Sequence, residues 1–430
     1  MIRPIWFALM LGSFIAIGAH KSAAAQSINV PLIAQERAQQ IGLQRAWVTQ
    51  VPLDRARSKI THIKLQAGLL LVVTSEHMLY VIDPESGQIQ WSFLIGDRKL
   101  MSLSPAANAT YVAVANTARL FLLNRATGDV VMDHEATGTP ERGPVLTAQK
   151  VILPLVNGPL QVYPRDDFVL LSELTDPKNT LSPAYYASAG RMFGDPATSD
   201  DLLIWAGDQN RISAHLFAEQ PVDFNKLVPE TLSTAPSLFA PNVYLGTELG
   251  YLIAYDVDHF NEAWRFSAGS PIHRRPIAIG SAVFVLPEEG GMFAVDPKTG
   301  EMLWFAPDPV QFVAASPQRI YTLDSFGRLT MLNAKTGART NAVSLPYSLK
   351  MLTNDQSDRL VFYTDQGLIQ SLHETTLTQP VLYSPPKKQE PTKKGAGGSS
   401  KPATAAADAK SDKTAPADAK SDKAPPAAKP

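Results

Sequence analysis

The 430-residue sequence contains no cysteine. This absence excludes disulfide bonds, thiolate zinc sites, iron–sulfur clusters, thiol nucleophiles and a lipidated N-terminal cysteine, because each of them needs a sulfur atom that the chain lacks. A net charge of −1 also removes the main argument for nucleic-acid binding, which rests on a strongly basic domain. The 34 prolines and 26 glycines favour strands and turns over long helices.

Residues 1–25 are typical of a cleaved secretory signal. Arg3 supplies the positive start, Ile5 to Ala19 form an uncharged apolar run, and Ala23 to Ala25 resemble a cleavage site. The run is shorter than the roughly 20 residues that span a bilayer, and no later stretch is long enough for a membrane helix. The sequence therefore predicts an exported protein of the periplasm or another extracytoplasmic compartment.

Residues 385–430 differ in composition from the rest, being rich in Lys, Ala, Pro, Asp, Ser and Gly, and 416–423 nearly repeat 406–413. Such a segment buries too little apolar surface to offset the entropy of ordering it, so we predict a disordered tail. The tail carries 10 Lys against 5 acidic residues, which leaves residues 26–384 with a net charge of −8. The tail is either a solvated spacer or a weak electrostatic contact to an anionic envelope polymer or lipid surface.

A repeat of about forty residues is the strongest pattern in the sequence. In each clear copy an apolar run ends in Asp or Asn, and Gly follows four residues later. The clearest copies are Asp83–Gly87, Asn124–Gly128, Asp296–Gly300 and Asn333–Gly337, and Asp256 begins a variant without the glycine. Three of these anchors are followed, eight residues on, by Trp91, Trp264 and Trp304. With weaker copies the chain has eight units, and one carries an insertion of about a dozen residues within 172–201.

Each unit consists of short apolar runs bounded by turn residues, which predicts strands. The Asp or Asn side chain caps the turn and the Gly supplies a positive φ, so each anchor joins two antiparallel strands. Four-stranded units at this period predict an all-β, eight-bladed β-propeller over residues 43–384, preceded by a lead-in at 26–42. The last unit lacks an outer strand, whereas 43–51 resemble one. We therefore expect an N-terminal strand to complete the last blade and close the ring.

The segments from Gly290 to Trp304 and from His77 to Trp91 resemble the repeat of the pyrroloquinoline-quinone-like (PQQ-like) propellers. With an export signal and a single eight-bladed ring, the chain resembles the BamB-type branch, whose known member is a scaffold in outer-membrane protein assembly. The resemblance implies protein partners in the cell envelope. This chain lacks the lipid-anchoring cysteine of that branch, so we do not expect a lipoprotein. It also lacks the adjacent cysteines of quinone-dependent alcohol dehydrogenases, so we expect no cofactor.

No set of residues predicts catalysis or metal binding. The sequence has neither a nucleotide-binding glycine loop nor a His-x-His or His-x-x-x-His pair. Asp256, Asp258 and Asn261 resemble the start of a calcium loop, but the central Gly and the terminal Glu are missing. An ordinary hairpin turn is the favoured interpretation of that segment.

Two segments are candidates for partner contact. His273, Arg274 and Arg275 form the densest basic cluster of the acidic core and precede a predicted innermost strand at 276–279. They are expected to face the mouth of the ring and hold an anion or an acidic partner segment, unless they form a solvated loop with local salt bridges. The second candidate is Tyr185 with Tyr186, because insertions on a rigid ring often carry binding function; the alternative is an ordered surface excursion.

The leading functional hypothesis is a non-catalytic, monomeric, exported scaffold that binds envelope proteins. One alternative is a quinone-dependent oxidoreductase or another small-ligand enzyme that uses the axial channel. A second is an envelope-polymer-binding or sensor module that uses the tail.

The turn at 165–167 is a further candidate for a partner contact on the rim of the ring; the alternative is a solvated turn whose charges pair with one another. The poorly patterned third and fourth units are either two blades or one enlarged blade.

Overall fold

The computed structural model describes residues 32–383 except 157, 165–182, 188–189, 200, 218–221 and 281. The predicted signal sequence, the turn at 165–167 and the tail lie outside the described residues. None of the described helices is long and apolar enough to cross a membrane.

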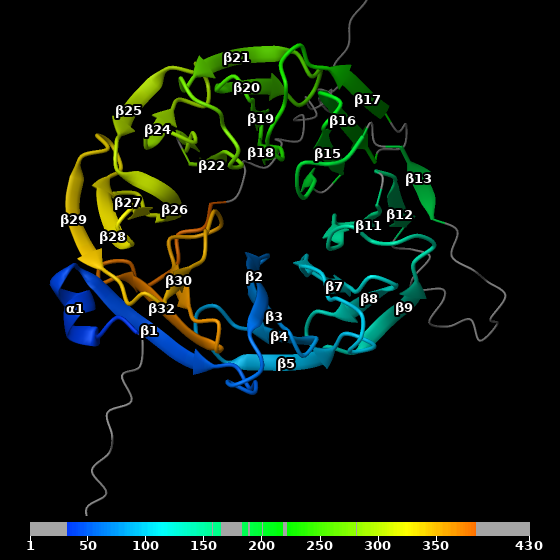
Figure 1. The fold of residues 1–430 in the computed structure, drawn as a ribbon, viewed down its shortest axis with the longest axis horizontal. Coiled ribbons are helices and arrows are strands. Elements are labelled where there is room, and N and C mark those ends of the chain that lie inside the picture. The colour runs from blue at the N-terminus through cyan, green and yellow to red at the C-terminus, as the bar shows by residue number, and fades with distance from the viewer. Residues whose placement is uncertain are drawn as a thin grey trace, which may run out of the picture. The chain divides into compact units, whose positions relative to one another are not determined.

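Eight four-stranded antiparallel sheets are arranged around a central axis (Figure 1). We number these blades in chain order of their innermost strands, and each runs from the axis outward. Blades 1 to 4 comprise, in turn, β2 (Ile60–Gln66), β3 (Leu69–Thr74), β4 (Met78–Ile82) and β5 (Ile89–Leu94); β6 (Ala106–Ala107), β7 (Tyr111–Ala115), β8 (Arg119–Asn124) and β9 (Val130–Glu135); β10 (Val145–Leu146), β11 (Lys150–Pro154), β12 (Leu160–Pro164) and β13 (Ala184–Tyr186); and β14 (Ala197–Thr198), β15 (Leu202–Gly207), β16 (Arg211–Leu216) and β17 (Val222–Leu227).

Blades 5 to 8 follow the same order. They comprise β18 (Ser237–Phe239), β19 (Asn242–Gly246), β20 (Tyr251–Asp256) and β21 (Glu262–Ser267); β22 (Ile277–Ile279), β23 (Ala282–Val285), β24 (Met292–Val295) and β25 (Met302–Ala306); β26 (Pro309–Ala315), β27 (Arg319–Asp324), β28 (Arg328–Asn333) and β29 (Arg339–Ser344); and β30 (Lys350–Met351), β31 (Leu360–Tyr363), β32 (Leu368–Glu374) and β1 (Leu43–Gln50). A short helix, α1 (Gln35–Gln40), precedes β1.

The prediction of an eight-bladed propeller is confirmed, and the poorly patterned third and fourth units are two separate four-stranded blades. The predicted closure is also confirmed. β1 pairs antiparallel with β32, with Leu43 opposite Glu374 and Gln50 opposite Leu368, so the first described strand completes the last blade (Figure 1). This pairing covers what would otherwise be a free edge on β32.

The anchor turns explain the repeat of Asp or Asn and Gly. In blade 1 the Asp83 carboxylate accepts hydrogen bonds from the backbone N–H groups of Glu85 (3.0 Å) and Ser86 (2.7 Å). Gly87 ends the turn with φ of 72°, a conformation that costs glycine little. The turn therefore needs both residue types, and the spacing between them is set by its geometry.

The glycine has a second role that involves the tryptophan of the preceding blade. Trp91 of blade 1 donates its indole N–H to the carbonyl of Arg125 in the anchor turn of blade 2 (2.9 Å). Its ring covers Gly128 so closely that an added Cβ would lie 2.7 Å from ring atoms. The same contact recurs at three other pairs: Trp47 with Gly87, Trp264 with Gly300, and Trp304 with Gly337. The repeat thus encodes the docking of one blade onto the next.

Antiparallel order gives the ring two different faces. One face, here called the connector face, carries the turns between second and third strands and the links from blade to blade. The other, here called the anchor face, carries the remaining turns, including the anchor turns. The apolar core lies between neighbouring blades, as in the cluster that joins Leu71 and Val81 of blade 1 to Val112 and Leu123 of blade 2.

Candidate functional site

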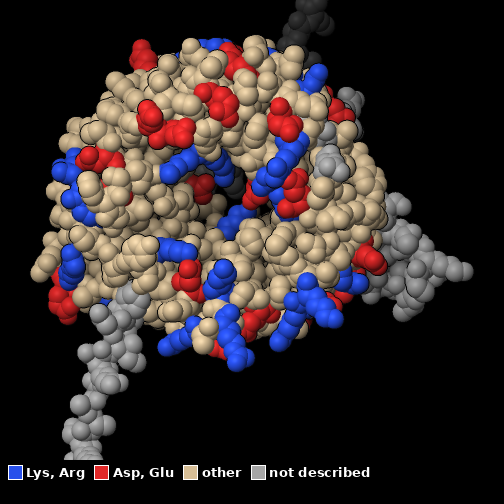
Figure 2. Space-filling model, in the orientation of Figure 1, with Lys and Arg blue, Asp and Glu red and all other residues tan. Residues whose placement is uncertain are grey.

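A cavity of about 790 Å³ lies on the axis, and the innermost strands of all eight blades contribute to its lining. Figure 2 shows the central opening of the ring with charged side chains around it. The walls also include aromatic residues, among them Phe239, Phe312, Tyr363 and Tyr383. A cavity of this size and mixed polarity can hold a small molecule or a few residues of a partner chain.

The cavity brings together charges from distant parts of the sequence. Lys64 Nζ lies 3.9 Å from Asp195 Oδ2, and Arg275 Nη1 lies 4.0 Å from Asp355 Oδ2. Both separations exceed a hydrogen-bond length, so neither ion pair is tight. Burial lowers the pKa of Lys64 and the Arg275 charge lowers it further, while the charges of Asp195 and Asp355 act in the opposite direction.

Arg274 is the third cation of the cavity wall, and the part of the chain that the structure describes offers it no carboxylate within 4 Å. With Lys64 and Arg275 it gives the lining three cations against the two carboxylates of Asp195 and Asp355. An excess cation whose neighbours form only long ion pairs can bind a carboxylate or another anion, because no tight ion pair has to be broken.

The structure separates the three predicted basic residues. His273 lies between Glu248 (3.7 Å) and Glu288 (3.4 Å), and with Arg274 it lines a smaller adjacent cavity of about 470 Å³. Arg274 and Arg275 line the axial cavity, and β22 begins directly afterwards at Ile277 as the innermost strand of its blade. The two arginines are at the predicted place, whereas the histidine is held by local acidic groups.

Tyr185 and Tyr186 lie elsewhere, on β13 at the outer wall of blade 3. The Tyr185 hydroxyl contacts Thr137 Oγ1 (2.5 Å) and accepts a hydrogen bond from Gln161 Nε2 (3.1 Å). The Tyr186 ring packs 4.2 Å from the ring of His215 in blade 4. Neither tyrosine lines the axial cavity, so the two predicted contact segments do not form one site.

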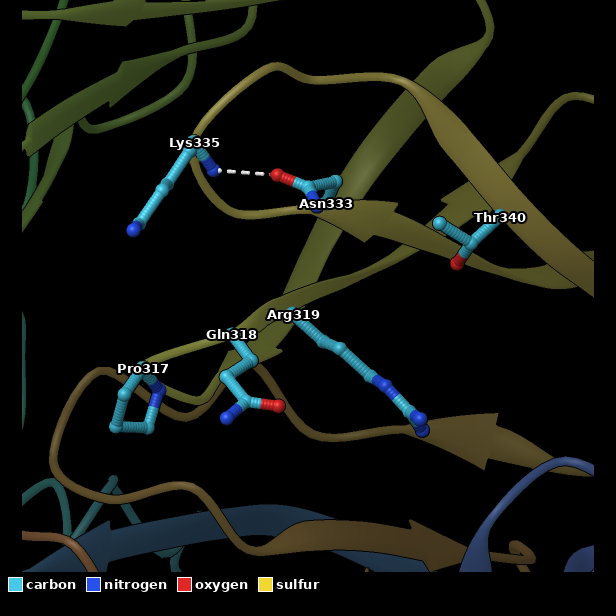
Figure 3. Close-up of a pocket in the computed structure, with 6 residues that line it drawn as sticks. All are labelled: Pro317, Gln318, Arg319, Asn333, Lys335 and Thr340. Atoms are coloured by element: carbon cyan, nitrogen blue, oxygen red, sulfur yellow. Dashed lines mark hydrogen bonds between the residues drawn. The ribbon is translucent and has the colours of Figure 1, made fainter.

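A second basic pocket lies on the anchor face of blade 7, and sequence reasoning missed it (Figure 3). Its volume is about 410 Å³, and it is lined by Pro317, Gln318, Arg319, Asn333, Lys335 and Thr340. Asn333 accepts the backbone N–H of Lys335 (2.9 Å) and so orders the turn. Arg319 donates to the carbonyl of Ile41 (3.2 Å), which ties this pocket to the segment before β1. Its signal in the sequence is only two cations fifteen or so residues apart, a spacing with no chemical meaning outside the fold.

The described ranges contain no group of three His, Asp or Glu side chains that could hold a metal ion. The calcium-like segment forms the hairpin that the sequence favoured. The Asp256 carboxylate accepts the backbone N–H groups of His259 (2.7 Å) and Asn261 (2.8 Å) and is therefore engaged in its own turn.

A family model described as outer membrane protein assembly factor BamB matches residues 47–165 and 189–372. The chain belongs to the BamB family. The break in the match, at 166–188, overlaps the insertion predicted within 172–201. The unmatched residues between the two matched segments include β13 of blade 3.

Two of the solved structures that share this fold have TM-scores above 0.5. The crystal structure of BamB from Moraxella catarrhalis is 16% identical, has a TM-score of 0.58, and covers 77% of this chain and 98% of its own. The computationally designed Ika8 protein is 10% identical, has a TM-score of 0.56, and covers 74% of this chain and 96% of its own. No curated protein matches the chain.

Proposed function

We propose that this protein is a non-catalytic scaffold that binds protein partners during outer-membrane protein assembly. Membership of the BamB family supports this role. We further propose that it works in the periplasm, is exported by a signal at residues 1–25 and carries no lipid anchor. The positive start, apolar run and small residues of segment 1–25 and the absence of cysteine in the sequence support these points.

The axial mouth is the proposed contact for an acidic segment of a partner. The observation that supports it is Arg274, which has no carboxylate within 4 Å among the described residues and lines the same cavity as two loose ion pairs. An incoming carboxylate would gain a strong partner there without breaking a tight one. Arg275 and Lys64 line the same cavity and could also contact this incoming carboxylate.

The connector face supplies apolar contacts around this mouth. Its loops carry exposed large apolar side chains from several blades: Met101, Val156, Leu249, Phe326 and Tyr347. Among the described residues between the strands on the anchor face, by comparison, Leu382 is the exposed large apolar residue. A rigid ring with apolar and charged groups gathered on the loops of one face is suited to holding a protein partner.

Crosslinking followed by mass spectrometry in the native envelope tests this proposal. We expect crosslinks from the connector face to envelope proteins, and a several-fold loss of them in the double variant Arg274→Ala/Arg275→Ala. The matched control is Arg55→Ala/Arg57→Ala, which removes two exposed arginines from another loop of the same face. Equal crosslinking in both variants, or no envelope partner at all, would contradict the proposal.

A titration separates this role from an enzyme that uses the axial cavity. We expect the tryptophan fluorescence to stay unchanged on addition of pyrroloquinoline quinone with calcium. Saturable quenching would instead support a cofactor-binding protein. A contact of the basic tail with anionic envelope polymer is a separate proposal, tested by sedimentation with isolated polymer before and after removal of residues 385–430.

A further inference from the structure

The outer strands of the blades differ in how their free edges are protected. A free edge exposes unpaired backbone N–H and C=O groups, and natural proteins commonly protect such edges with charged side chains. Five of the eight outer strands contain charged residues, namely β1, β9, β17, β21 and β29. Of the other three, β13 has three residues and β5 presents mainly polar side chains.

The remaining strand, β25 of blade 6, is both uncharged and apolar on its exposed side. Met302, Leu303 and Phe305 are 54%, 47% and 41% exposed. In β5 the one large apolar residue exposed to this degree is Leu94, at 41%. The edge of blade 6 therefore lacks the protection found on most of the ring.

Phe305 is held in place by a ladder of aromatic rings. Its centroid lies 4.7 Å from that of Phe293 in β24, which lies 5.3 Å from Phe266 in blade 5. Side chains alternate along a strand, so Leu303 shares the exposed side with Phe305, while Trp304 points the other way and docks on Gly337. The apolar strip is thus preformed, because the Phe305 ring packs on Phe293 and the Trp304 ring between Leu303 and Phe305 is buried.

The backbone of Phe305 is also available. The N–H of Asp296 donates to the carbonyl of Glu301 (2.8 Å), so the backbone of Asp296 faces β25. Backbone groups alternate in direction along a strand, and those of Ala294 therefore also face β25, whereas those of Phe293 face the opposite neighbour, β23. Phe293 is the register partner of Phe305. Phe305 therefore turns its own N–H and C=O to the open edge.

We propose that β25 binds an extended segment with apolar side chains at alternate positions, which adds a fifth strand to blade 6. An extended strand is the one conformation that satisfies the free edge along its length. Alternate apolar residues would cover Leu303 and Phe305 and leave the other side chains in solvent. This is the pattern of a membrane-spanning β-strand, so the inference rests on the proposed role in outer-membrane protein assembly and names its client as an unfolded strand of that type.

A second copy of the chain is a weaker occupant of the same edge. β25 is five residues long, and pairing two such strands buries far less than the roughly 1,200 Å² of a stable interface between folded proteins. A client strand does not need a stable interface, since an assembly factor must release it.

The test uses the full-length protein and a labelled ten-residue peptide in which Val or Tyr alternates with Ser or Thr, with binding followed by fluorescence anisotropy. We expect Phe305→Glu to weaken binding at least tenfold. The matched control Leu94→Glu, at an equally exposed position on the edge of blade 1, should change it less than twofold. Leu303→Lys provides a second variant that leaves the aromatic ladder intact, and it should also weaken binding at least tenfold.

A second comparison isolates the backbone contribution. Two further peptides have the same side chains but carry N-methyl groups on alternate residues, one on the odd and one on the even positions. At least one of them should bind the protein tenfold more weakly than the unmethylated peptide. Equal binding of both N-methylated peptides, or of the blade 6 variants and wild type, would overturn the inference. The inference would also be overturned if the wild-type protein did not bind the peptide but formed a dimer that Phe305→Glu dissociates. If the peptide does not bind but the connector-face crosslinks persist, this inference fails and the proposed scaffold role stands.

Discussion

The interfaces between neighbouring blades, here called seams, differ in the residues that form them. At four of them, a tryptophan on an outer strand docks on the anchor-turn glycine of the next blade and donates its indole N–H to that turn. The seam between blades 4 and 5 uses other chemistry. There Phe224 stacks on Phe260 at 4.5 Å, and Lys226 Nζ donates to the Phe260 carbonyl (2.7 Å).

The difference explains why some blades have a clear sequence pattern and others do not. The tryptophan seams need one geometry, so tryptophan and glycine recur at corresponding positions of the repeat. In blade 5 the glycine position holds Phe260, with φ of 54°, and the preceding blade has no tryptophan on its outer strand. The seam between blades 3 and 4 likewise relies on Tyr186, His215 and Phe217. Both kinds of seam place an aromatic contact between neighbouring blades.

The largest expected effect comes from filling the space beneath a docked tryptophan. Gly128→Ala should lower the free energy of unfolding by about 3–5 kcal/mol, because the new Cβ would lie 2.7 Å from the Trp91 ring and the residue would keep φ of 78°. Gly269→Ala is the matched control, since its φ is 80° but nothing lies within 4 Å of its Cβ. It should lose only about 1 kcal/mol, from backbone strain. Urea denaturation measures both, and equal losses would show that the glycines serve the turn and not the docking.

The seam between blades 8 and 1 contains a buried arginine, Arg359, in addition to its docked tryptophan, Trp47. Arg359 is fully buried and contacts Glu85 of the blade 1 anchor turn (3.0 Å), Asp358 (3.3 Å) and the carbonyls of Leu377 and Thr378 (3.1 and 3.0 Å). Arg359→Met should cost about 3 kcal/mol at pH 7, because it leaves the buried Asp358 carboxylate without its cation. Arg119→Met, at an exposed ion pair, should cost under about 1 kcal/mol.

The same variant has a pH signature. Burial raises the pKa of Asp358, so the folded protein holds this proton more tightly than the unfolded chain does. Ionised Asp358 therefore lowers the free energy of unfolding. This loss is absent below the pKa that Asp358 has in the unfolded chain and complete above the pKa that it has in the folded protein. Loss of Arg359 raises the folded pKa further, so Arg359→Met should be less destabilising at pH 4 than at pH 7. Urea melts at the two pH values test this, and an equal loss at both would contradict it.

The smallest expected effect concerns the seam between blades 4 and 5, where an aromatic pair replaces the docked tryptophan. Phe260→Gly relieves a positive φ but removes the ring that stacks on Phe224, so we expect a net loss of about 2 kcal/mol by urea denaturation. Lys226→Met should lose less than about 1 kcal/mol, because the Phe260 carbonyl remains able to bind water. A Phe260→Gly variant as stable as wild type would mean that the turn, not the aromatic pair, governs this seam.

Local chemistry determined most of the architecture. The anchor Asp or Asn, the glycine four residues later and the tryptophan each follow from short-range turn and strand geometry, so they repeat and can be counted. The closure by residues 43–51 could be predicted for the same reason, since that segment resembles the missing outer strand. The position of Arg274 and Arg275 at the ring mouth followed from placing them before an innermost strand.

The tertiary structure decided the contacts between residues that share no spacing. The pairing of Lys64 with Asp195 and of Arg359 with Glu85 joins different blades or the two ends of the ring. The separation of Tyr185 from the arginines and the exposed edge of β25 also depend on where each blade falls around the axis. The sequence determined each blade because a blade is made by its own forty residues. Only the closed ring determined the charge of its channel and the chemistry of its seams, because those surfaces exist where separate blades meet.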